Sequence, residues 1–272
     1  MALVIEAGAW EPLRWRGAGP LEQARRILSR VALCLPTYRE PTSATAAQVA
    51  TLELLGALPL RLSDCGNVAM ARNAITARWM GLGDPRPWLL CIDGDVSAPE
   101  GAAAWLEFVA RAIERWPDGE AAVCGCYPWR RRGGGRFAVS FVEPEGVTLG
   151  QGGGYHRAKW AGGGALLIHR SAVDRLGEIA GGMRLRYRFG GRADVGPQVW
   201  HNTSIETPDG VVEEAGEDVG LTQDLVTMGI DLWCDTRLRL DHEGACRFTW
   251  EDALRPEPPR SASIPLVTGG PS

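Results

Sequence analysis

Residues 88–95 read Trp-Leu-Leu-Cys-Ile-Asp-Gly-Asp, an apolar run that ends in two carboxylates separated by a glycine. Five consecutive apolar residues before a polar turn predict a buried strand. The glycine lets the chain turn, so Asp93 and Asp95 are both expected at the carboxyl edge of that strand. Hard divalent cations such as Mg²⁺ and Mn²⁺ take oxygen ligands and often share them with substrate phosphates. The stretch therefore predicts an α/β fold with a site for a metal-bound diphosphate.

Strands and helices alternate on both sides of this stretch. Apolar runs predict strands at 31–35, where Pro36 is expected to stop the strand, and at 60–62, 88–92 and 121–126. Helical periodicity predicts helices at 21–30, 45–58, 67–80 and 100–115. This alternation is typical of a mostly parallel sheet that is covered by helices on both faces.

The second half of the chain is richer in glycine and has shorter apolar runs. Strands are expected at 136–142, 165–169, 232–234 and 238–240, with helices at 171–176 and 218–228. Residues 181–213 are polar and glycine-rich, so they are expected to be mainly loop and to be a candidate lid over the site. The tail, 255–272, is rich in Pro, Ser and Gly and is expected to be disordered.

Bulk composition narrows the class of protein. The chain has 272 residues, 45% of them hydrophobic, which is enough for one large α/β domain or two small ones. A net charge of −4 excludes a generally basic nucleic-acid-binding protein. The seven cysteines include no CxxC pair, which disfavours a zinc ribbon or a redox motif. With no apolar run near 18 residues and no signal-peptide pattern, a cytoplasmic protein without a membrane span is expected.

Several short motifs occur in a recognisable order. They are Leu35-Pro36-Thr37-Tyr38, Ala71-Arg72-Asn73, Ile92-Asp93-Gly94-Asp95, Gly125-Cys126-Tyr127-Pro128, Gly162-Gly163-Gly164-Ala165, Gly216-Glu217-Asp218 and Leu240-Asp241-His242. This order resembles that of GT-A glycosyltransferases, close to glycosyltransferase family 2 and its phage-associated relatives. The resemblance implies a Rossmann-like, mostly parallel central sheet flanked by helices, with a smaller mixed region on the acceptor side. It implies one domain over 1–254, with a nucleotide-binding half at 31–126 and an acceptor-binding half at 127–254.

The resemblance also implies roles for the donor side. Residues expected to bind the sugar nucleotide are Pro36, Thr37, Tyr38, Asp64, Asn67, Arg72, Asp93 and Gly94. Among them, Asp64 is expected to accept a hydrogen bond from a uracil base. Mn²⁺ or Mg²⁺ is expected on Asp95 and His242, with Asp93 contacting ribose, metal-bound water or the metal.

On the acceptor side, the resemblance gives Asp218 the role of catalytic base and Glu217 that of its partner. The implied activity is metal-dependent transfer of a sugar from a nucleoside diphosphate, most simply UDP, with inversion at the anomeric carbon. The sequence lacks QxxRW, which disfavours a processive polysaccharide synthase.

Simpler interpretations stay open for each motif. Asp93 and Asp95 fit a polar turn, Glu217 and Asp218 fit a helix N-terminus, and His242 fits a core histidine. A nucleotidyltransferase is an alternative enzyme class, although it usually carries a glycine-rich basic loop where this chain has 36–40, Pro-Thr-Tyr-Arg-Glu. A non-catalytic module that binds sugars or nucleic acids on the same fold is the third class.

Two arginine clusters suggest an acceptor. Arginines with interleaved aromatic residues fit contact with phosphates and stacked bases, although they also fit solvated loops. The cluster residues considered are Arg130, Arg131, Arg132, Arg136, Arg186 and Arg188. By analogy with phage relatives, the acceptor is expected to be DNA that carries a hydroxymethylated pyrimidine, modified in the host cytoplasm after the base leaves the stack. No obligatory protein partner is indicated.

Overall fold

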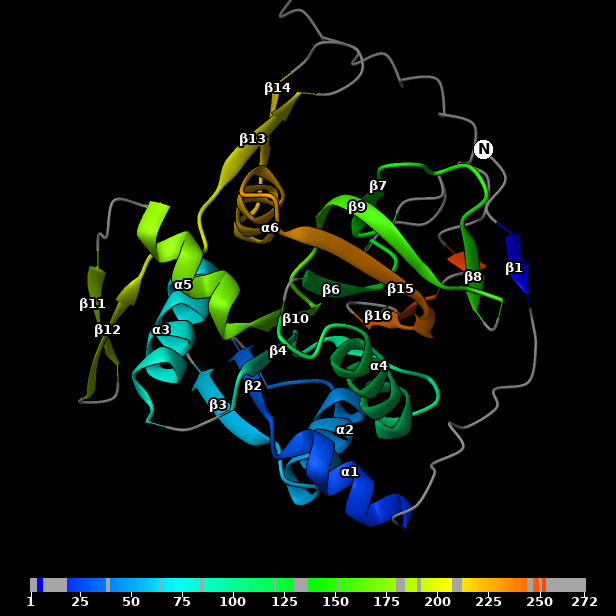
Figure 1. Cartoon of the computed structure of the whole chain (residues 1–272), viewed down its shortest axis with the longest axis horizontal. Coiled ribbons are helices and arrows are strands. Elements are labelled where there is room, and N and C mark those ends of the chain that lie inside the picture. Colours follow the sequence, from blue (N-terminus) through cyan, green and yellow to red (C-terminus); the bar gives the residue numbers. More distant parts are fainter. Residues whose placement is uncertain are drawn as a thin grey trace, which may run out of the picture.

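The computed structural model describes residues 4–6, 19–37, 40–63, 65–83, 86–119, 121–129, 137–150, 152–179, 184–189, 192–206, 212–243, 247–249 and 251–252. A central sheet with helices on both faces dominates this part of the chain (Figure 1). Its strands follow one another across the sheet as β3 (Leu58–Ser63), β2 (Val31–Thr37), β4 (Trp88–Ile92), β10 (Ala165–His169), β6 (Ala121–Cys126), β15 (Asp231–Arg239), β9 (Tyr155–Ala161) and β7 (Val139–Phe141).

The direction of the strands defines an α/β fold with a mostly parallel sheet. β2 pairs in parallel with both β3 and β4, and β6 pairs in parallel with β15. β10 lies antiparallel between β4 and β6, and β9 lies antiparallel between β15 and β7. The strand β4 coincides with the predicted buried strand and is buried at all five positions. The acidic turn therefore follows directly from a strand near the middle of the sheet.

Two hydrophobic clusters cover the two faces of the sheet, because successive side chains of a strand point to opposite faces. In β4, Trp88 and Leu90 belong to one cluster, and Leu89 and Cys91 belong to the other. The first face packs against α1 (Pro20–Leu28), α2 (Ser43–Leu54) and α4 (Ala102–Arg115). The second face packs against α3 (Val68–Gly81), α5 (Arg170–Ile179) and α6 (Glu217–Thr227).

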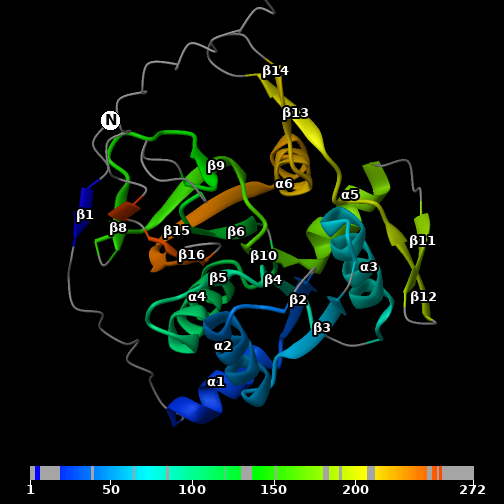
Figure 2. The same ribbon diagram turned by 180° about the vertical axis from the view of Figure 1, so that it is seen from behind.

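Smaller sheets surround this body. The three-stranded sheet β17-β16-β5 joins Arg247–Phe248, Asp241–Glu243 and Val96–Ser97. In the view from behind, β5 and β16 are drawn just above α4, and β5 contacts α2 (Figure 2). A parallel pair joins β1 (Val4–Glu6) to β8 (Thr148–Gly150). The pairing of β5 with β16 brings the chain after β4 into direct contact with the chain near residue 242.

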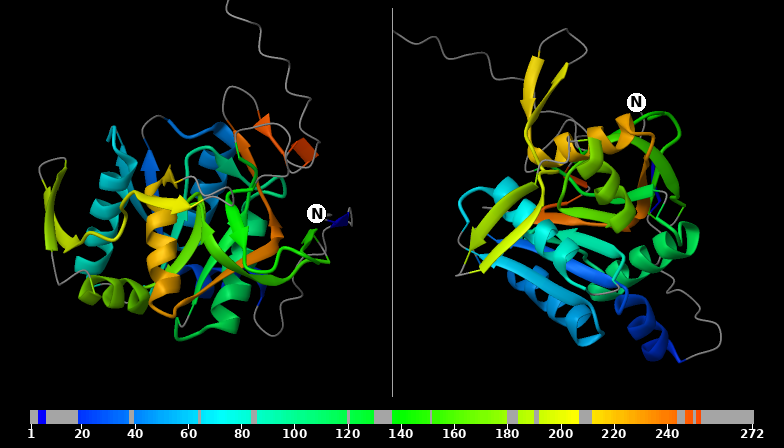
Figure 3. Two further views of the ribbon diagram at one scale, coloured as in Figure 1. Left: turned by 90° about the horizontal axis from the view of Figure 1, so that it is seen from above. Right: turned by 60° about the vertical axis from the view of Figure 1, so that its left-hand side comes forward.

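Two hairpins correct the expectation that residues 181–213 are mainly loop. One joins β11 (Arg184–Phe189) to β12 (Arg192–Pro197), and the other joins β13 (Thr203–Glu206) to β14 (Val212–Ala215). The first hairpin lies along α3, and the second stands out from the body of the protein (Figure 3). The loop expectation gave weight to glycine and missed the alternation of polar and apolar residues over Arg184–Phe189, which is the pattern of a strand.

Three other predicted boundaries are wrong. β2 continues through Pro36 to Thr37, because its pairing with β4 ends at Cys34 and a missing N–H is tolerated where a strand has one neighbour. α2 ends at Leu54, because Gly56 takes a φ of 113° that ends the helix. The short strands expected at 232–234 and 238–240 are one strand, β15, with a shift of register between Asp235 and Arg239. The tail expected at 255–272 lies outside the described residues.

Candidate functional site

A buried arginine holds two carboxylates together at the end of β4. Arg72, in α3, is 2% exposed. Its Nη2 donates to Asp93 Oδ1 at 2.5 Å, and its Nη1 donates to Glu217 Oε1. Burial lowers the pKa of Arg72, but the carboxylates of Asp93, Glu217 and Asp218 outweigh that effect and hold the pKa well above its ordinary value. The side chain therefore stays charged, and we call these four residues the Arg72 cluster.

The acidic pair Glu217 and Asp218 opens helix α6. The residue before it, Gly216, has no side chain to cap the helix, and Asp218 Oδ1 accepts from the backbone N–H of Val219 at 2.8 Å. The other oxygen, Asp218 Oδ2, accepts from the N–H of Gly163 at 3.0 Å. The interpretation as a helix N-terminus thus accounts for one oxygen of Asp218, while the second oxygen holds a distant turn of the chain. Burial raises the pKa of Glu217, and the Arg72 guanidinium opposes that shift.

The glycines at 162–164 form the wall of the Arg72 cluster. A Cβ on Gly163 would lie 2.6 to 2.8 Å from the guanidinium atoms of Arg72. A Cβ on Gly164 would lie 3.0 Å from both Asp93 Oδ2 and the Tyr127 hydroxyl. The N–H of Gly164 also donates to that hydroxyl at 3.0 Å. These glycines are therefore explained by the close approach of protein side chains to the backbone.

The second part of the site pairs Asp95 with His242. The antiparallel pairing of β5 and β16 places His242 opposite Val96, and the N–H of Glu243 donates to the carbonyl of Asp95 at 2.7 Å. His242 Nε2 lies 3.5 Å from Asp95 Oδ1. The structure thus brings together two side chains that are far apart in the sequence. We call them the Asp95–His242 pair.

Tyr127 connects the pair to the Arg72 cluster. Its hydroxyl accepts from Gly164, and its ring meets the His242 ring edge-on at a centroid distance of 5.4 Å. Burial raises the pKa of Tyr127 well above its ordinary value, and the negative charges of Asp93 and Asp218 raise it further. The phenol therefore stays neutral and acts as a fixed spacer between the two groups.

The chemistry of the Asp95–His242 pair fits a divalent cation. His242 Nδ1 lies 3.0 Å from the carbonyl oxygen of Pro128, which can only accept, so Nδ1 carries the proton. In the neutral ring Nε2 then has the lone pair, as in histidines that bind metals. Two ligand atoms that are each about 2.1 Å from one ion are at most about 4.2 Å apart, and the observed separation of 3.5 Å meets that limit. Among the described residues, no group of three or more His, Cys, Asp or Glu side chains is arranged to hold a metal.

The residues expected to contact the nucleotide are only partly described. Tyr38 and Asp64 lie outside the described residues. Gly94 packs closely on the chain after β2: a Cβ there would lie 3.3 Å from Pro41 Cα and 3.6 Å from Thr37 Cγ2. Pro36 is buried in β2, and Thr37, at the end of that strand, is partly exposed.

Three more residues expected to bind the nucleotide, Asn67, Arg72 and Asp93, form contacts within the protein. Asn67 caps the helix, because its side chain accepts from the N–H of Met70 at 2.9 Å. Arg72 and Asp93 face each other inside the Arg72 cluster, so Arg72 lies beneath the surface of the site.

Trp200 is a site residue that the sequence did not reveal. Its ring lies under the Arg72 guanidinium, with 4.9 Å between Arg72 Cζ and the ring centroid, and its indole N–H donates to Thr76 Oγ1 at 3.0 Å. Asn73 fixes this segment, since its Oδ1 accepts from the N–H groups of Val199 and Trp200 and its Nδ2 donates to the Trp200 carbonyl. A lone tryptophan in a polar, glycine-rich stretch is the signal that was available.

Comparison with known proteins gives the fold and no family. No family model matches the sequence, and no curated protein matches it. A solved structure described as A197 from STIV is similar over 86% of this chain and 97% of its own, with a TM-score of 0.54 and 15% sequence identity. The chain therefore shares an α/β architecture with that protein.

Within the described residues, no helix is both long enough and apolar enough to cross a membrane.

Proposed function

We propose that the chain is a GT-A glycosyltransferase that transfers a sugar from a nucleoside diphosphate to an acceptor hydroxyl. The observation that carries this proposal is the meeting of the Asp95–His242 pair with the Arg72 cluster beyond the end of β4. The expected divalent cation is Mn²⁺ or Mg²⁺, the expected nucleotide is UDP, and the expected acceptor is a hydroxymethylated pyrimidine in DNA.

The balance of charge in the site supports a cation-dependent reaction. Its described side chains include one guanidinium, Arg72, and four carboxylates, those of Asp93, Asp95, Glu217 and Asp218. One positive and four negative formal charges would repel a diphosphate, which is itself an anion. A divalent cation held by the Asp95–His242 pair would relieve that repulsion and supply Lewis-acid stabilisation of the departing diphosphate.

Asp218 is the residue best suited to accept the proton of the acceptor. Each of its oxygens accepts one backbone N–H, and a carboxylate oxygen has a second lone pair. As the acceptor oxygen bonds to the anomeric carbon, its proton passes to Asp218 and the electron pair of the broken bond leaves with the diphosphate. Such general-base assistance contributes ~10²- to 10⁴-fold to a rate. Direct displacement of this kind inverts the anomeric carbon.

Arg72 and Glu217 act as positioning residues in this mechanism. Arg72 is buried, so it is not available to the acceptor, but it orients Asp93 and Glu217 through two ion pairs. Glu217 precedes Asp218 in the chain, so the ion pair that fixes Glu217 also helps to orient the Asp218 carboxylate. A bidentate guanidinium is the side chain best able to fix two carboxylates at once.

Hydrolysis of sugar nucleotides in the presence of Mn²⁺ tests the proposal. UDP-, GDP-, CDP- and dTDP-sugars are offered to the wild type, to Asp95→Asn and His242→Gln, and to a control variant, Asp231→Asn, which removes an exposed partner of Arg157. We expect hydrolysis by the wild type and the control, and at least about a hundredfold loss in both site variants, comparable to loss of a charge-stabilising group.

Three outcomes would contradict the proposal. If no sugar nucleotide is hydrolysed and none raises the melting temperature with Mn²⁺, the donor assignment fails. If Asp95→Asn hydrolyses its donor as fast as the wild type, the metal site fails. Binding without hydrolysis in every variant would instead favour a non-catalytic module.

A further inference from the structure

The hairpin β11–β12 presents two chemically different faces. Its inner face packs on α3, where Tyr187 forms a hydrophobic cluster with Ala74 and Ala77. On the same face, Asp194 accepts from Arg78 at 3.2 Å. The hairpin is thus anchored to α3 by apolar packing and an ion pair, which leaves the opposite face to solvent.

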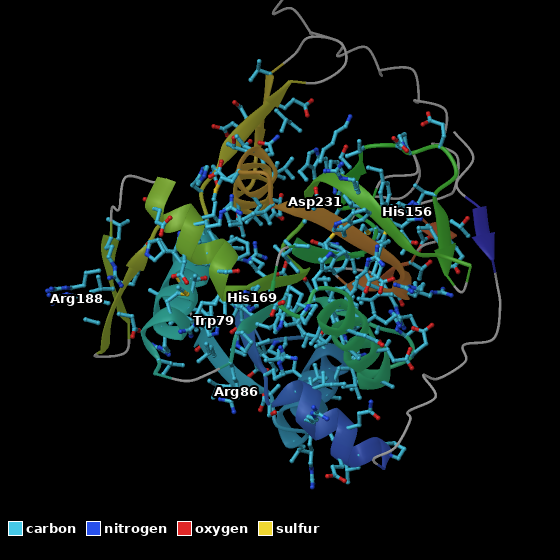
Figure 4. The ribbon with its side chains drawn as sticks, in the orientation of Figure 1. Trp79, Arg86, His156, His169, Arg188 and Asp231 are labelled. Carbon is cyan, nitrogen blue, oxygen red and sulfur yellow. The ribbon has the colours of Figure 1, made fainter. Side chains whose placement is uncertain are left out.

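The outer face carries a row of arginines. Arg184, Arg186 and Arg188 alternate with the inward residues, and all three are exposed. Their cross-strand partners are Pro197, Val195 and Ala193, none of which is acidic. Arg184 Nη2 donates to the carbonyl of Val195 at 3.2 Å, and none of the three arginines forms an ion pair within the described part of the chain. The side chain of Arg188 points away from the body of the protein (Figure 4).

The linear order of this arginine row suits a linear polyanion. Alternate residues of a strand are about 6.7 Å apart, because each residue advances the chain by about 3.3 to 3.4 Å. A nucleic-acid strand presents a row of single negative charges, and arginine binds phosphate oxygens through two parallel hydrogen bonds. We propose that the arginine row binds the sugar-phosphate backbone of a nucleic-acid strand, which makes a nucleic acid the acceptor of the reaction proposed above. This inference rests on that proposed function.

The hairpin is physically connected to the candidate site. Gly196 packs on α3 so closely that a Cβ there would lie 2.5 Å from Ala77 Cβ. Ala77 is five residues beyond Arg72 in the same helix, a rise of about 7.5 Å. The chain then continues from Pro197 to Trp200, whose ring lies under Arg72. A nucleic-acid strand on the arginine row is therefore bound by the hairpin whose chain continues to Trp200, beside Arg72.

Tyr187 corrects one part of the expectation drawn from the sequence. The alternation of arginine and aromatic residues suggested base stacking, but Tyr187 is 7% exposed and packs on α3. It is not available to stack on a base. The hairpin can contribute contacts to phosphates and no aromatic platform from this residue, so binding is expected to depend strongly on salt and weakly on base sequence.

Two other anionic partners fit the row less well. The second hairpin is acidic, but Glu213 and Glu214 are adjacent in β14 and so point to opposite faces, which gives no matching row on a second copy of the chain. A membrane surface is broad and would meet the whole molecule, whose net charge is −4. A single nucleic-acid strand is narrow enough to contact only the arginine row.

Fluorescence anisotropy of a labelled 12-nucleotide single-stranded DNA, measured with full-length protein at 50 to 300 mM NaCl, tests the inference. The variant R184Q/R186Q/R188Q is compared with R25Q/R26Q/R115Q, which removes the same charge from exposed arginines of α1 and α4. We expect the slope of log affinity against log salt to fall in magnitude by ~2 in the hairpin variant, since each phosphate contact contributes ~0.7. The control variant should keep most of the slope.

Three results would overturn the inference: no DNA binding by the wild type at 50 mM NaCl, equal loss in both triple variants, or hairpin-dependent binding only to anionic vesicles or to a second copy of the chain, the last seen by analytical ultracentrifugation. Failure of the proposed function would look different. Asp95→Asn should lose donor hydrolysis and keep DNA binding. If the wild type and all variants lack donor hydrolysis but the wild type binds DNA through the hairpin, the proposed transferase activity is contradicted and the proposed DNA contact of the arginine row is kept.

Discussion

Replacing Arg72 by methionine should reveal how the site is held together. The change keeps an unbranched apolar stem and removes a charge that is 2% exposed. Its partner Glu217 has a side chain that is 11% exposed, whereas that of Asp93 is 28% exposed and can regain water. Breaking a buried ion pair from one side typically costs ~3–5 kcal/mol, because the remaining charge stays desolvated. We expect a loss of about 3 to 5 kcal/mol in the free energy of unfolding at pH 8, mostly from Glu217.

The loss should depend on pH with a definite sign. Burial raises the pKa of Glu217 in the folded protein, with smaller contributions of the same sign from Asp218 and Asp93, whereas Arg72 and, more weakly, a backbone hydrogen bond oppose the shift. Without Arg72 the pKa rises further. A carboxyl whose folded-state pKa is raised has its full stability below the unfolded value, near 4.5, and loses stability as the pH rises through the folded-state pKa. The cost of Arg72→Met should therefore be smaller at pH 5 than at pH 8.

Guanidinium chloride unfolding of wild type and variant at both pH values measures these costs. Arg157→Met is the control, because the side chain of its partner Asp231 is 43% exposed and can regain water. In the double variant R72M/E217Q the pH dependence should disappear. The reasoning is refuted if Arg72→Met costs less than ~1 kcal/mol, if its cost is the same at both pH values, or if the double variant keeps the pH dependence.

Three further predictions concern single contacts. Gly163→Ala should lower the free energy of unfolding by more than ~1 kcal/mol and weaken sugar-nucleotide binding, because its Cβ would lie 2.6 to 2.8 Å from a buried guanidinium. Gly154→Ala, with open space around its Cβ, should do neither in the same denaturation and calorimetry experiments. Tyr127→Phe should cost ~1–3 kcal/mol in chemical denaturation, because the N–H of Gly164 loses its acceptor; an unchanged midpoint would count against that contact. Burial lowers the pKa of His201, but the hydrogen bonds to Asp224 and to the Asn202 carbonyl, together with the negative charge of Asp224, outweigh burial, so the net pKa is raised. The pair of His201 and Asp224 should therefore stabilise the fold below pH ~6.5 and lose that stabilisation as the pH rises further. The stabilisation should be less than ~1 kcal/mol, because both side chains are exposed. Melting temperatures of wild type and Asp224→Asn should differ more at pH 5 than at pH 8, and parallel curves would exclude a stabilising pair.

The sequence predicts those parts of the site that depend on one local pattern. The run 88–95 identifies β4 and the two carboxylates after it, because a buried strand and a polar turn are both encoded locally. The start of α6 is predicted in the same way from its acidic first turn. His242 is different, because its position opposite Val96 depends on the pairing of β16 with β5. Only resemblance to a family suggested that residue.

Contacts between distant segments explain what the sequence did not predict. Trp200 becomes a site residue because Asn73 binds its backbone, and nothing near residue 200 encodes that partner. The antiparallel strand β10 joins β4 to β6, although the chain between them suggests a simple parallel order. The hairpin β11–β12 is the opposite case, since its alternating residues were sufficient to predict a strand. Its burial of Tyr187 required the position of α3.

Pulsed electron paramagnetic resonance of Mn²⁺ bound with UDP tests the central claim most directly. If Asp95 and His242 hold a cation that also binds a diphosphate, the spectrum of the wild type contains couplings to both ¹⁴N and ³¹P. His242→Gln should remove the ¹⁴N coupling. Asp95→Asn should weaken Mn²⁺ binding. A spectrum of bound Mn²⁺ with neither nitrogen nor phosphorus coupling, or a nitrogen coupling that survives in His242→Gln, would contradict the account.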